Sequence, residues 1–207
     1  MTISALIMAG GKGTRMNSKQ EKPLIKICDK PVIDYVFDAL KNTKKIDNIY
    51  IAVTKQTPKT TKHIEKFQAT TVTTPGKDYV SDMGYATQTL KLGKFLAIAA
   101  DLPLVTGEIL DQIIKQYEKC RKPALTVAIP IETKIKMGMS IEYSFKMNDK
   151  DVVPVGINII DGNKQYGDEW LDQHIYLLNQ PELAINVNTP HELQIAQTLL
   201  SNHKQTK

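Results

Sequence analysis

The sequence predicts an α/β fold in which a mostly parallel β-sheet is covered by helices on both faces. Short blocks of apolar, largely β-branched residues recur along the chain, and polar or turn-forming residues separate them. Continuous apolar blocks of this length are typical of strands buried on both faces. Amphipathic helical patterns lie between the blocks. This alternation favours a parallel sheet that binds ligands at the carboxyl ends of its strands.

Four strands are expected, at residues 3–9, 49–53, 95–100 and 125–129. Pro31 can begin the first amphipathic helix, because its fixed φ angle suits the first helical position. The apolar face of this helix comprises Val32, Ile33, Val36, Phe37 and Leu40. A second helix follows the third strand, and its apolar face comprises Ile109, Leu110, Ile113, Ile114 and Tyr117.

The C-terminal third has a different pattern. Residues 141–147 and 152–160 are extended segments around the polar residues 148–151, which predicts a small antiparallel hairpin insertion. Thr189 can cap a final helix, Pro190 suits its first position and Glu192 completes a capping box. The apolar face of this helix comprises Leu193, Ala196, Leu199 and Leu200. We expect residues 1–200 to form a single domain and residues 201–207 to form a frayed tail.

Composition limits the class of protein. The 207 residues are 42% apolar and 24% charged, as in ordinary soluble proteins. No apolar run approaches the roughly 20 residues of a membrane-spanning helix, and the N-terminal residues lack the basic region of a signal peptide. We therefore expect a cytoplasmic protein. Two distant cysteines, Cys28 and Cys120, and four scattered histidines predict neither a disulfide framework nor a metal cluster.

The charge is unevenly distributed along the chain. The formal net charge is +5, but residues 1–66 hold 13 basic and 6 acidic side chains, whereas residues 67–207 hold 14 and 16. An anionic partner of the N-terminal third is one interpretation, and a solvated lysine-rich surface is the other. Nucleic-acid binding is not favoured, because most aromatic side chains near these charges fall in predicted core elements.

A glycine-rich segment, LIMAGGKGTRM at residues 6–16, follows the first predicted strand. Gly10, Gly11 and Gly13 allow backbone N–H groups to approach an anion, and Lys12 and Arg15 add positive charge. The alternative is a glycine turn without a ligand. The P-loop pattern requires a Gly-Lys-Ser/Thr ending that is absent, and the dinucleotide fingerprint requires a glycine where the sequence has methionine.

This segment resembles the signature loop of the nucleotidyltransferases, which wraps the phosphates of a nucleoside triphosphate. A Lys-Pro-Leu motif follows that loop in the superfamily, and residues 22–24 match it. The resemblance implies a Rossmann-like nucleotidyltransferase fold, with Arg15 and Lys22 acting on the phosphates. It also implies that the nucleotide-binding loop comprises Met8, Ala9, Gly10, Gly11, Lys12, Gly13 and Thr14.

Asp101 ends the third apolar block, in the segment AIAADLPLV. Alone, an Asp-x-Pro sequence is more often a turn former than a site. Beside a triphosphate, however, one carboxylate is sufficient for Mg²⁺, which prefers one or two carboxylates together with waters and phosphate oxygens. The resemblance assigns Asp101 to the catalytic, metal-binding aspartate of these transferases.

A third segment, INVNTP at residues 185–190, resembles the N-x-N-T-P segment of guanylyltransferases in this superfamily. The side-chain oxygens of Asn186 and Asn188 can complete a metal shell or bind a ribose, and alternate positions of a strand share one face. The alternative is that both are polar residues that lead into a capped helix. We favour Asn188 as the metal ligand, because it lies nearer the start of the helix.

Two further segments carry candidate ligand-binding residues. Superfamily members hold the base in the region corresponding to residues 75–90, where a polar turn leads into a helix that Asp82 can cap. The base-binding candidates are Gly76, Tyr79, Asp82 and Gly84. Gly156 interrupts an apolar strand, where glycine often marks a bulge or a close ligand approach, and Gly156 and Asn158 are candidates for the acceptor site.

The whole pattern, including PGKDYVSDMGYA and PVGINI, resembles the archaeal-type adenosylcobinamide-phosphate guanylyltransferases. The resemblance implies GTP as the substrate, a phosphorylated corrinoid as the acceptor and Mg²⁺ as the cofactor. The molybdenum-cofactor guanylyltransferases, which have a Gly-Gly-x-Ser-x-Arg-Met-Gly loop, and transferases that use sugar phosphates are alternatives. A nucleotide-binding regulatory module is the alternative that is not an enzyme. The sequence leaves open whether the protein is a homodimer.

Overall fold

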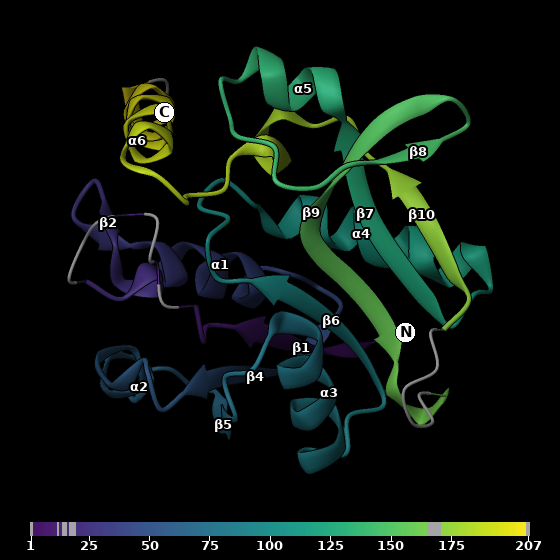
Figure 1. The fold of residues 1–207 in the computed structure, drawn as a ribbon. Helices are drawn as coiled ribbons and strands as arrows, with labels where there is room; N and C mark the ends of the chain where they lie inside the picture. The colour runs from purple at the N-terminus through teal and green to yellow at the C-terminus, as the bar shows by residue number, and fades with distance from the viewer. Residues whose placement is uncertain (1, 12, 14–15, 17–19, 165–170, 206–207) are drawn as a thin grey trace.

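An eight-stranded sheet forms the centre of the structure, with helices on both faces (Figure 1). The computed structural model describes every residue except 1, 12, 14–15, 17–19, 165–170 and 206–207. The sheet has the order β10-β7-β9-β6-β1-β4-β5, and β8 pairs with β9 at its edge. The strands are β1 (Ile3–Met8), β4 (Ile46–Thr54), β5 (Thr70–Thr74), β6 (Lys94–Ala99), β7 (Ala124–Pro130), β8 (Phe145–Met147), β9 (Lys150–Asp161) and β10 (Gln173–Leu177).

The predicted parallel arrangement is confirmed for the first half of the sheet. β1 pairs in parallel with β4 on one side and with β6 on the other, and β5 pairs in parallel with β4. The chain therefore crosses from the outer strand β5 back over β1 to β6. Such a reversal of strand order opens a crevice at the carboxyl ends of the strands, where α/β proteins bind ligands.

Helices cover the two faces of this sheet. The longer helices are α1 (Val32–Lys41), α3 (Tyr79–Thr89), α4 (Gly107–Cys120) and α6 (Pro190–Gln205), and the shorter ones are α2 (Pro58–Ile64) and α5 (Ile131–Lys136). Ile7 of β1 joins the core packed by α1 and α4, whereas Leu6 joins the core packed by α3. Within the described residues, no helix combines the length and apolar character needed to span a membrane.

The helical patterns of the sequence correspond to real elements. α1 begins directly after Pro31, and all five residues of its expected apolar face are buried. The expected face of α4 is likewise buried, and the Thr106 side chain caps this helix by accepting a hydrogen bond from the Ile109 N–H at 3.3 Å. Periodic burial of apolar side chains, rather than intrinsic helix propensity, therefore determines these elements.

The expected hairpin is present, but its second strand is not an insertion. β8 and β9 pair around a two-residue turn in which Asn148 and Asp149 both have positive φ angles, as a tight hairpin turn requires. β9 then continues to Asp161 and pairs antiparallel with β6 and β7, so it belongs to the central sheet. A second, smaller hairpin joins β2 (Lys26–Ile27) to β3 (Lys30–Pro31).

Two helix ends differ from the sequence expectation. Asp78, not Asp82, caps α3, because the Asp78 side chain accepts a hydrogen bond from the Ser81 N–H at 2.9 Å. α6 extends to Gln205, so the segment expected to fray from residue 201 is helical over most of its length. The capping box at the start of α6 is confirmed by reciprocal hydrogen bonds between Thr189 and Glu192, at 3.0 and 3.2 Å.

Two glycines offer a matched test of this packing. A Cβ atom on Gly107 would lie 2.7 Å from the backbone oxygen of Asn42, whereas a Cβ atom on Gly84 would meet nothing within 4 Å. We predict that Gly107→Ala lowers the free energy of unfolding by about 1–3 kcal/mol. Gly84→Ala should raise it by up to about 1 kcal/mol, because alanine is favoured over glycine within a helix.

Urea unfolding of the two variants measures both effects. Equal stability of Gly107→Ala and the parent protein would contradict the close contact between α4 and the end of α1.

Candidate active site

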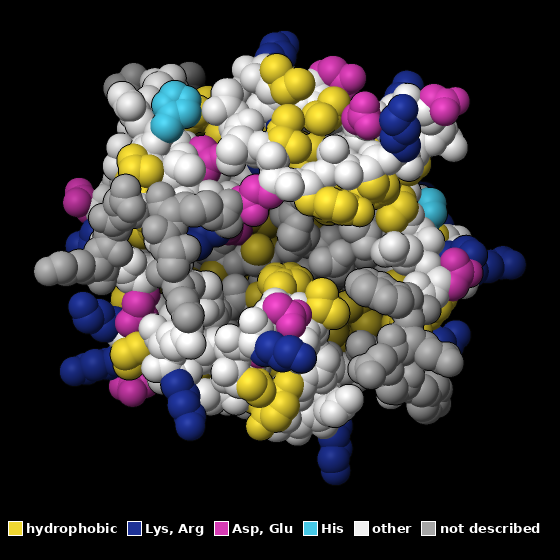
Figure 2. Space-filling view, viewed as in Figure 1, with side chains coloured by type: hydrophobic (Ala, Val, Ile, Leu, Met, Phe, Trp, Pro, Cys, Tyr) yellow, Lys and Arg dark blue, Asp and Glu magenta, His cyan; other side chains and the backbone are white. Residues whose placement is uncertain are grey.

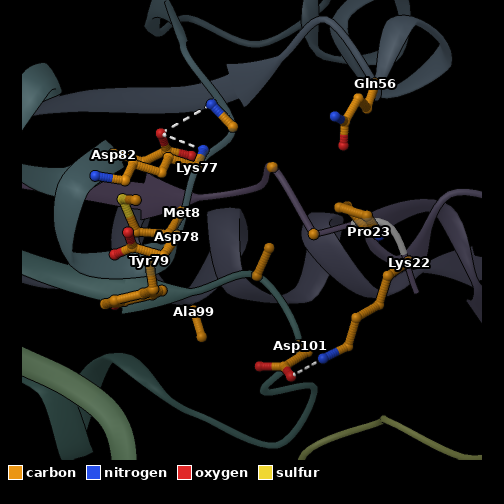
Figure 3. A pocket seen from close by; sticks show the side chains of 14 residues that line it. Met8, Lys22, Pro23, Gln56, Lys77, Asp78, Tyr79, Asp82, Ala99 and Asp101 are labelled. Atoms are coloured by element: carbon orange, nitrogen blue, oxygen red, sulfur yellow. Dashed lines mark hydrogen bonds and ion pairs between the residues drawn. The ribbon is translucent and has the colours of Figure 1, made fainter. Parts of the chain in front are cut away.

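A cavity of about 400 Å³ lies at the carboxyl ends of β1, β4 and β6, in the predicted crevice (Figure 3). Many of the residues that the sequence predicted to bind the nucleotide line this cavity. The lining comprises Met8, Gly10, Gly11, Lys22, Pro23, Gln56, Gly76, Lys77, Asp78, Tyr79, Asp82, Ala99, Ala100 and Asp101. Segments that are far apart in sequence therefore meet at one edge of the sheet.

The glycine loop folds tightly against its neighbours. A Cβ atom on Gly10 would lie 2.5 Å from the Thr54 side chain, so β4 excludes any larger residue there. Gly13 has a φ angle of +67°, and a Cβ atom added to it would lie 3.0 Å from the Cβ of Lys22. Gly10 therefore requires glycine for a steric reason, and Gly13 for a conformational one. Lys12, Thr14 and Arg15, which the sequence assigns to the phosphates, lie outside the described residues.

Lys22 joins three distant segments at the floor of the cavity. Its Nζ donates hydrogen bonds to Asp101 Oδ2 and to Asn188 Oδ1, both at 2.5 Å. The Asp101 and Asn188 residues are 9% and 6% exposed. Because burial of a carboxylate is costly without a partner, this cation stabilises the close approach of the two oxygens. The structure thus brings Lys22, Asp101 and Asn188 together, as the sequence predicted.

Asn186 has a different partner. Its Oδ1 accepts a hydrogen bond from the Nζ of Lys134, a residue of α5 that is 4% exposed. Burial lowers the pKa of Lys134, and the negative charges of Glu192, Asp101 and Glu142 oppose that effect. Of the two asparagines, only Asn188 shares a cation with Asp101 among the described contacts.

Glu192 holds the asparagine segment in place. Its Oε2 accepts hydrogen bonds from the N–H groups of Asn188 at 2.7 Å and Thr189 at 3.0 Å. Its Oε1 accepts from the N–H and the hydroxyl of Ser140, at 3.0 and 2.5 Å. One buried carboxylate therefore links the start of α6, the strand-like segment before it and the connection that follows α5.

The segment after β5 forms the opposite wall of the cavity. Asp82 Oδ1 accepts hydrogen bonds from the N–H groups of Gly76 at 2.9 Å and Lys77 at 3.3 Å, so this carboxylate shapes the turn that lines the cavity (Figure 3). Tyr79 extends along the same wall. Burial of its hydroxyl and the charge of Asp101 raise the Tyr79 pKa, whereas a hydrogen bond with Asn158 lowers it.

Seven of the described residues that the sequence predicted for the site do not line the cavity, namely Ala9, Gly13, Gly84, Gly156, Asn158, Asn186 and Asn188. Ala9 is completely buried, and Gly84 lies further along α3 with open space beside it. Gly156 has a φ angle of +75° and packs against Ala99, which itself lines the cavity. Asn158 Oδ1 accepts a hydrogen bond from Thr126 at 2.9 Å. Gly156 and Asn158 therefore lie behind the wall rather than in it.

Sequence reasoning missed Gln56 and Lys134. Gln56 lies on the side of the cavity away from Tyr79 (Figure 3). It follows the carboxyl end of β4, so the rule that ligands bind at strand ends could have found it. The burial of Lys134 has no comparable signal, because its partner Asn186 lies 52 residues away. Within the described residues, no group of three His, Cys, Asp or Glu side chains forms a metal cluster.

Residues 5–136 match the family model of the MobA-like NTP transferase domain. The chain belongs to the MobA-like NTP transferase family. A relative that covers nearly the full length is the adenosylcobinamide-phosphate guanylyltransferase of Methanocaldococcus jannaschii, which is 35% identical over 96% of this chain and 97% of its own. The probable molybdenum cofactor guanylyltransferase of Thermococcus kodakarensis is 32% identical, but over 57% of this chain and 55% of its own.

Solved structures confirm the fold of this NTP transferase. CMP:2-keto-3-deoxy-manno-octonic acid synthetase superposes with a TM-score of 0.71 and 12% identity, over 98% of this chain and 100% of that one. A putative glucose-1-phosphate thymidylyltransferase of Bacillus anthracis superposes with a TM-score of 0.70 and 14% identity, over 95% and 94%. The expected nucleotidyltransferase fold is confirmed, and the chain is a nucleotidyltransferase.

The linking role of Glu192 predicts a dependence of stability on pH. Burial tends to raise the Glu192 pKa, but hydrogen bonds from Ser140 and Asn188 and the charge of Lys134 together hold it below its ordinary value of 4.5. A carboxylate with a lowered pKa contributes stability above its unfolded-state pKa, and loses that contribution as the pH falls through the folded value. Glu192→Gln should therefore be less stable at neutral pH and lose less stability on acidification.

Urea unfolding at a series of pH values from about 7 down to 3 measures both parts of this prediction. The exposed Glu132→Gln is a matched control and should follow the parent protein. Parallel stability curves for Glu192→Gln and the parent would show that Glu192 is not the group responsible.

Proposed function

We propose that this NTP transferase moves GMP from GTP to the phosphate group of adenosylcobinamide phosphate. The observation that supports this proposal most strongly is the 35% identity with a named guanylyltransferase along nearly the full length of both chains. The cavity supplies the matching chemistry, because a glycine loop, a lysine and an aspartate converge at its floor. The products are adenosylcobinamide-GDP and pyrophosphate.

The reaction needs no protein nucleophile. A non-bridging oxygen of the acceptor phosphate attacks the α-phosphorus of GTP, and the bond from that phosphorus to the oxygen shared with the β-phosphate breaks. Pyrophosphate leaves with the electron pair. The protein positions two anions that repel each other and neutralises the charge that develops on the α-phosphate and the leaving group. We assign this neutralisation to the glycine loop, Lys12, Arg15 and Lys22.

The residues at the cavity floor suit a magnesium ion. Asp101 Oδ2 and Asn188 Oδ1 both lie 2.5 Å from the same ammonium nitrogen, so a carboxylate oxygen and an amide oxygen converge on one cationic position. Hard oxygen ligands of this kind are those that Mg²⁺ prefers. We propose that Asp101 and Asn188 hold Mg²⁺ together with phosphate oxygens, where it offsets negative charge on the triphosphate.

The base is proposed to lie between Met8 and the turn at residues 76–79. Backbone groups of this turn are fixed by Asp82, and the Tyr79 ring and the Gln56 amide lie on opposite sides of the cavity (Figure 3). A rigid turn of backbone donors and acceptors can select one base by its hydrogen-bonding edge. We therefore propose that this wall recognises guanine, and that the backbone of Gly76 takes part in this recognition.

Pyrophosphate release tests the proposed function. We expect turnover with GTP and adenosylcobinamide phosphate, and little turnover when ATP, CTP or UTP replaces GTP. Saturable GTP binding without pyrophosphate release in the presence of the acceptor would instead indicate a nucleotide-binding module. A preference for molybdopterin as the acceptor would support the molybdenum-cofactor alternative, whose named relatives here match only about half of the chain.

Lys22→Met tests the cation at the cavity floor. Loss of one positioned donor to the transition state typically costs about 2.7–4 kcal/mol, so turnover should fall at least roughly a hundredfold. Lys26→Met removes an exposed lysine four residues away and is the matched control. Steady-state rates with GTP and acceptor measure the effect, and circular dichroism checks the fold. Near-normal turnover of Lys22→Met would remove Lys22 from the mechanism.

A further inference from the structure

The nucleotide cavity is too small to enclose a corrinoid acceptor as well. Its volume of about 400 Å³ is near the lower end for ligand pockets, and its walls are the segments proposed to bind the nucleotide. A corrinoid is a cobalt-containing macrocycle, wider than a nucleoside, with a conjugated ring and many methyl and amide substituents. Only its phosphate arm can reach Lys22 and Asp101, so the macrocycle must rest on the surface beside the cavity.

Large apolar side chains are exposed on the connection between α5 and β8 and on α3. Tyr143 is 63% exposed and Ile141 37% exposed, both in the connection between α5 and β8, and Val80 on the first turn of α3 is 49% exposed. Figure 2 shows apolar side chains above and below a hollow in the middle of this face. In Figure 1 the connection from α5 to β8 runs above this region and α3 lies below it.

The connection that carries Ile141 and Tyr143, residues 138–144, is anchored at both ends. Ser140 donates two hydrogen bonds to Glu192, the carboxylate that also fixes the N–H of Asn188. At the other end, Phe145 pairs with Val152 at the start of β9. The ring centroids of Tyr143 and Phe145 lie 6.1 Å apart, so the exposed Tyr143 ring packs near a second aromatic ring. This connection is therefore positioned rather than loose.

We propose that Ile141 and Tyr143 form an acceptor platform that binds the apolar face and methyl groups of the corrinoid macrocycle, with α3, which carries Val80, on the opposite side of the hollow. This inference rests on the proposed function. Residues 138–144 lie beyond the family model, which ends at residue 136. The alignment with the cobinamide relative covers 96% of the chain, so the similarity to that guanylyltransferase includes this region.

A second copy of the chain is the less favourable occupant. A stable dimer buries about 800 Å² on each partner, and a platform built on a seven-residue connection presents much less than that. A flat conjugated macrocycle, by contrast, can be contacted by one tyrosine ring and one aliphatic side chain, since stacked rings and methyl groups give most of their energy over a small area.

The test is the double variant Ile141→Ser/Tyr143→Ser. We expect the KM for adenosylcobinamide phosphate to rise roughly tenfold, because both apolar contacts are lost. The affinity for GTP, measured by calorimetry, and the kcat at saturating acceptor should stay near those of the parent. Tyr85→Ser, which removes an exposed tyrosine from another face of α3, is the matched control and should leave the KM unchanged.

Three results would overturn the platform. If the parent protein turns over the corrinoid and the double variant has the same acceptor KM, the platform alone is wrong. If that unchanged KM accompanies a shift from dimer to monomer in analytical ultracentrifugation, the surface is an interface between copies. If the parent protein turns over no phosphorylated corrinoid, the proposed function fails and the platform fails with it.

Discussion

The pair of hydrogen bonds from Lys22 to Asp101 and Asn188 is the interaction on which the site depends. These residues are separated by 79 and 166 positions along the chain, yet one ammonium group contacts both oxygens at 2.5 Å. Each comes from a segment at the carboxyl edge of the sheet, where the loop after β1, the end of β6 and the approach to α6 meet. Burial of the Asp101 carboxylate without this cation would be strongly unfavourable. The sheet topology that buries Asp101 therefore depends on Lys22 as its partner.

Two further charged residues, Glu192 and Lys134, hold the segment that contains Asn188 in place. Glu192 fixes the backbone of Asn188, and Lys134 holds Asn186 two residues earlier, so both sides of this short segment are restrained. Lys134 can remain buried because the carboxylates of Glu192, Asp101 and Glu142 offset part of its desolvation. Precise placement of the reacting groups requires such support, since a displacement of about 1 Å can cost two orders of magnitude in rate.

The sequence predicted the parts of this structure that local patterns encode. Apolar periodicity located α1 and α4, and the Thr189–Glu192 capping box located the start of α6. It misjudged the cap of α3, because Asp78 and Asp82 are both suitable residues and only the three-dimensional turn gives Asp82 its bonds to residues 76 and 77. The placement of β9 between β6 and β7 and the burial of Lys134 depend on long-range contacts that no local pattern specifies.

The two substrates therefore make different demands on the chain. A nucleoside triphosphate presents the same phosphates to every member of the family, and residues 5–136, which match the family model, supply the glycine loop, Lys22 and Asp101. Acceptors differ widely in size and polarity, and the proposed acceptor platform lies in the residues that follow, in the connection between α5 and β8. Because Glu192 joins that connection to Asn188, a change that adapts the acceptor side is transmitted to the proposed metal ligand. The proposed acceptor platform and the proposed metal ligand are therefore joined through one buried carboxylate.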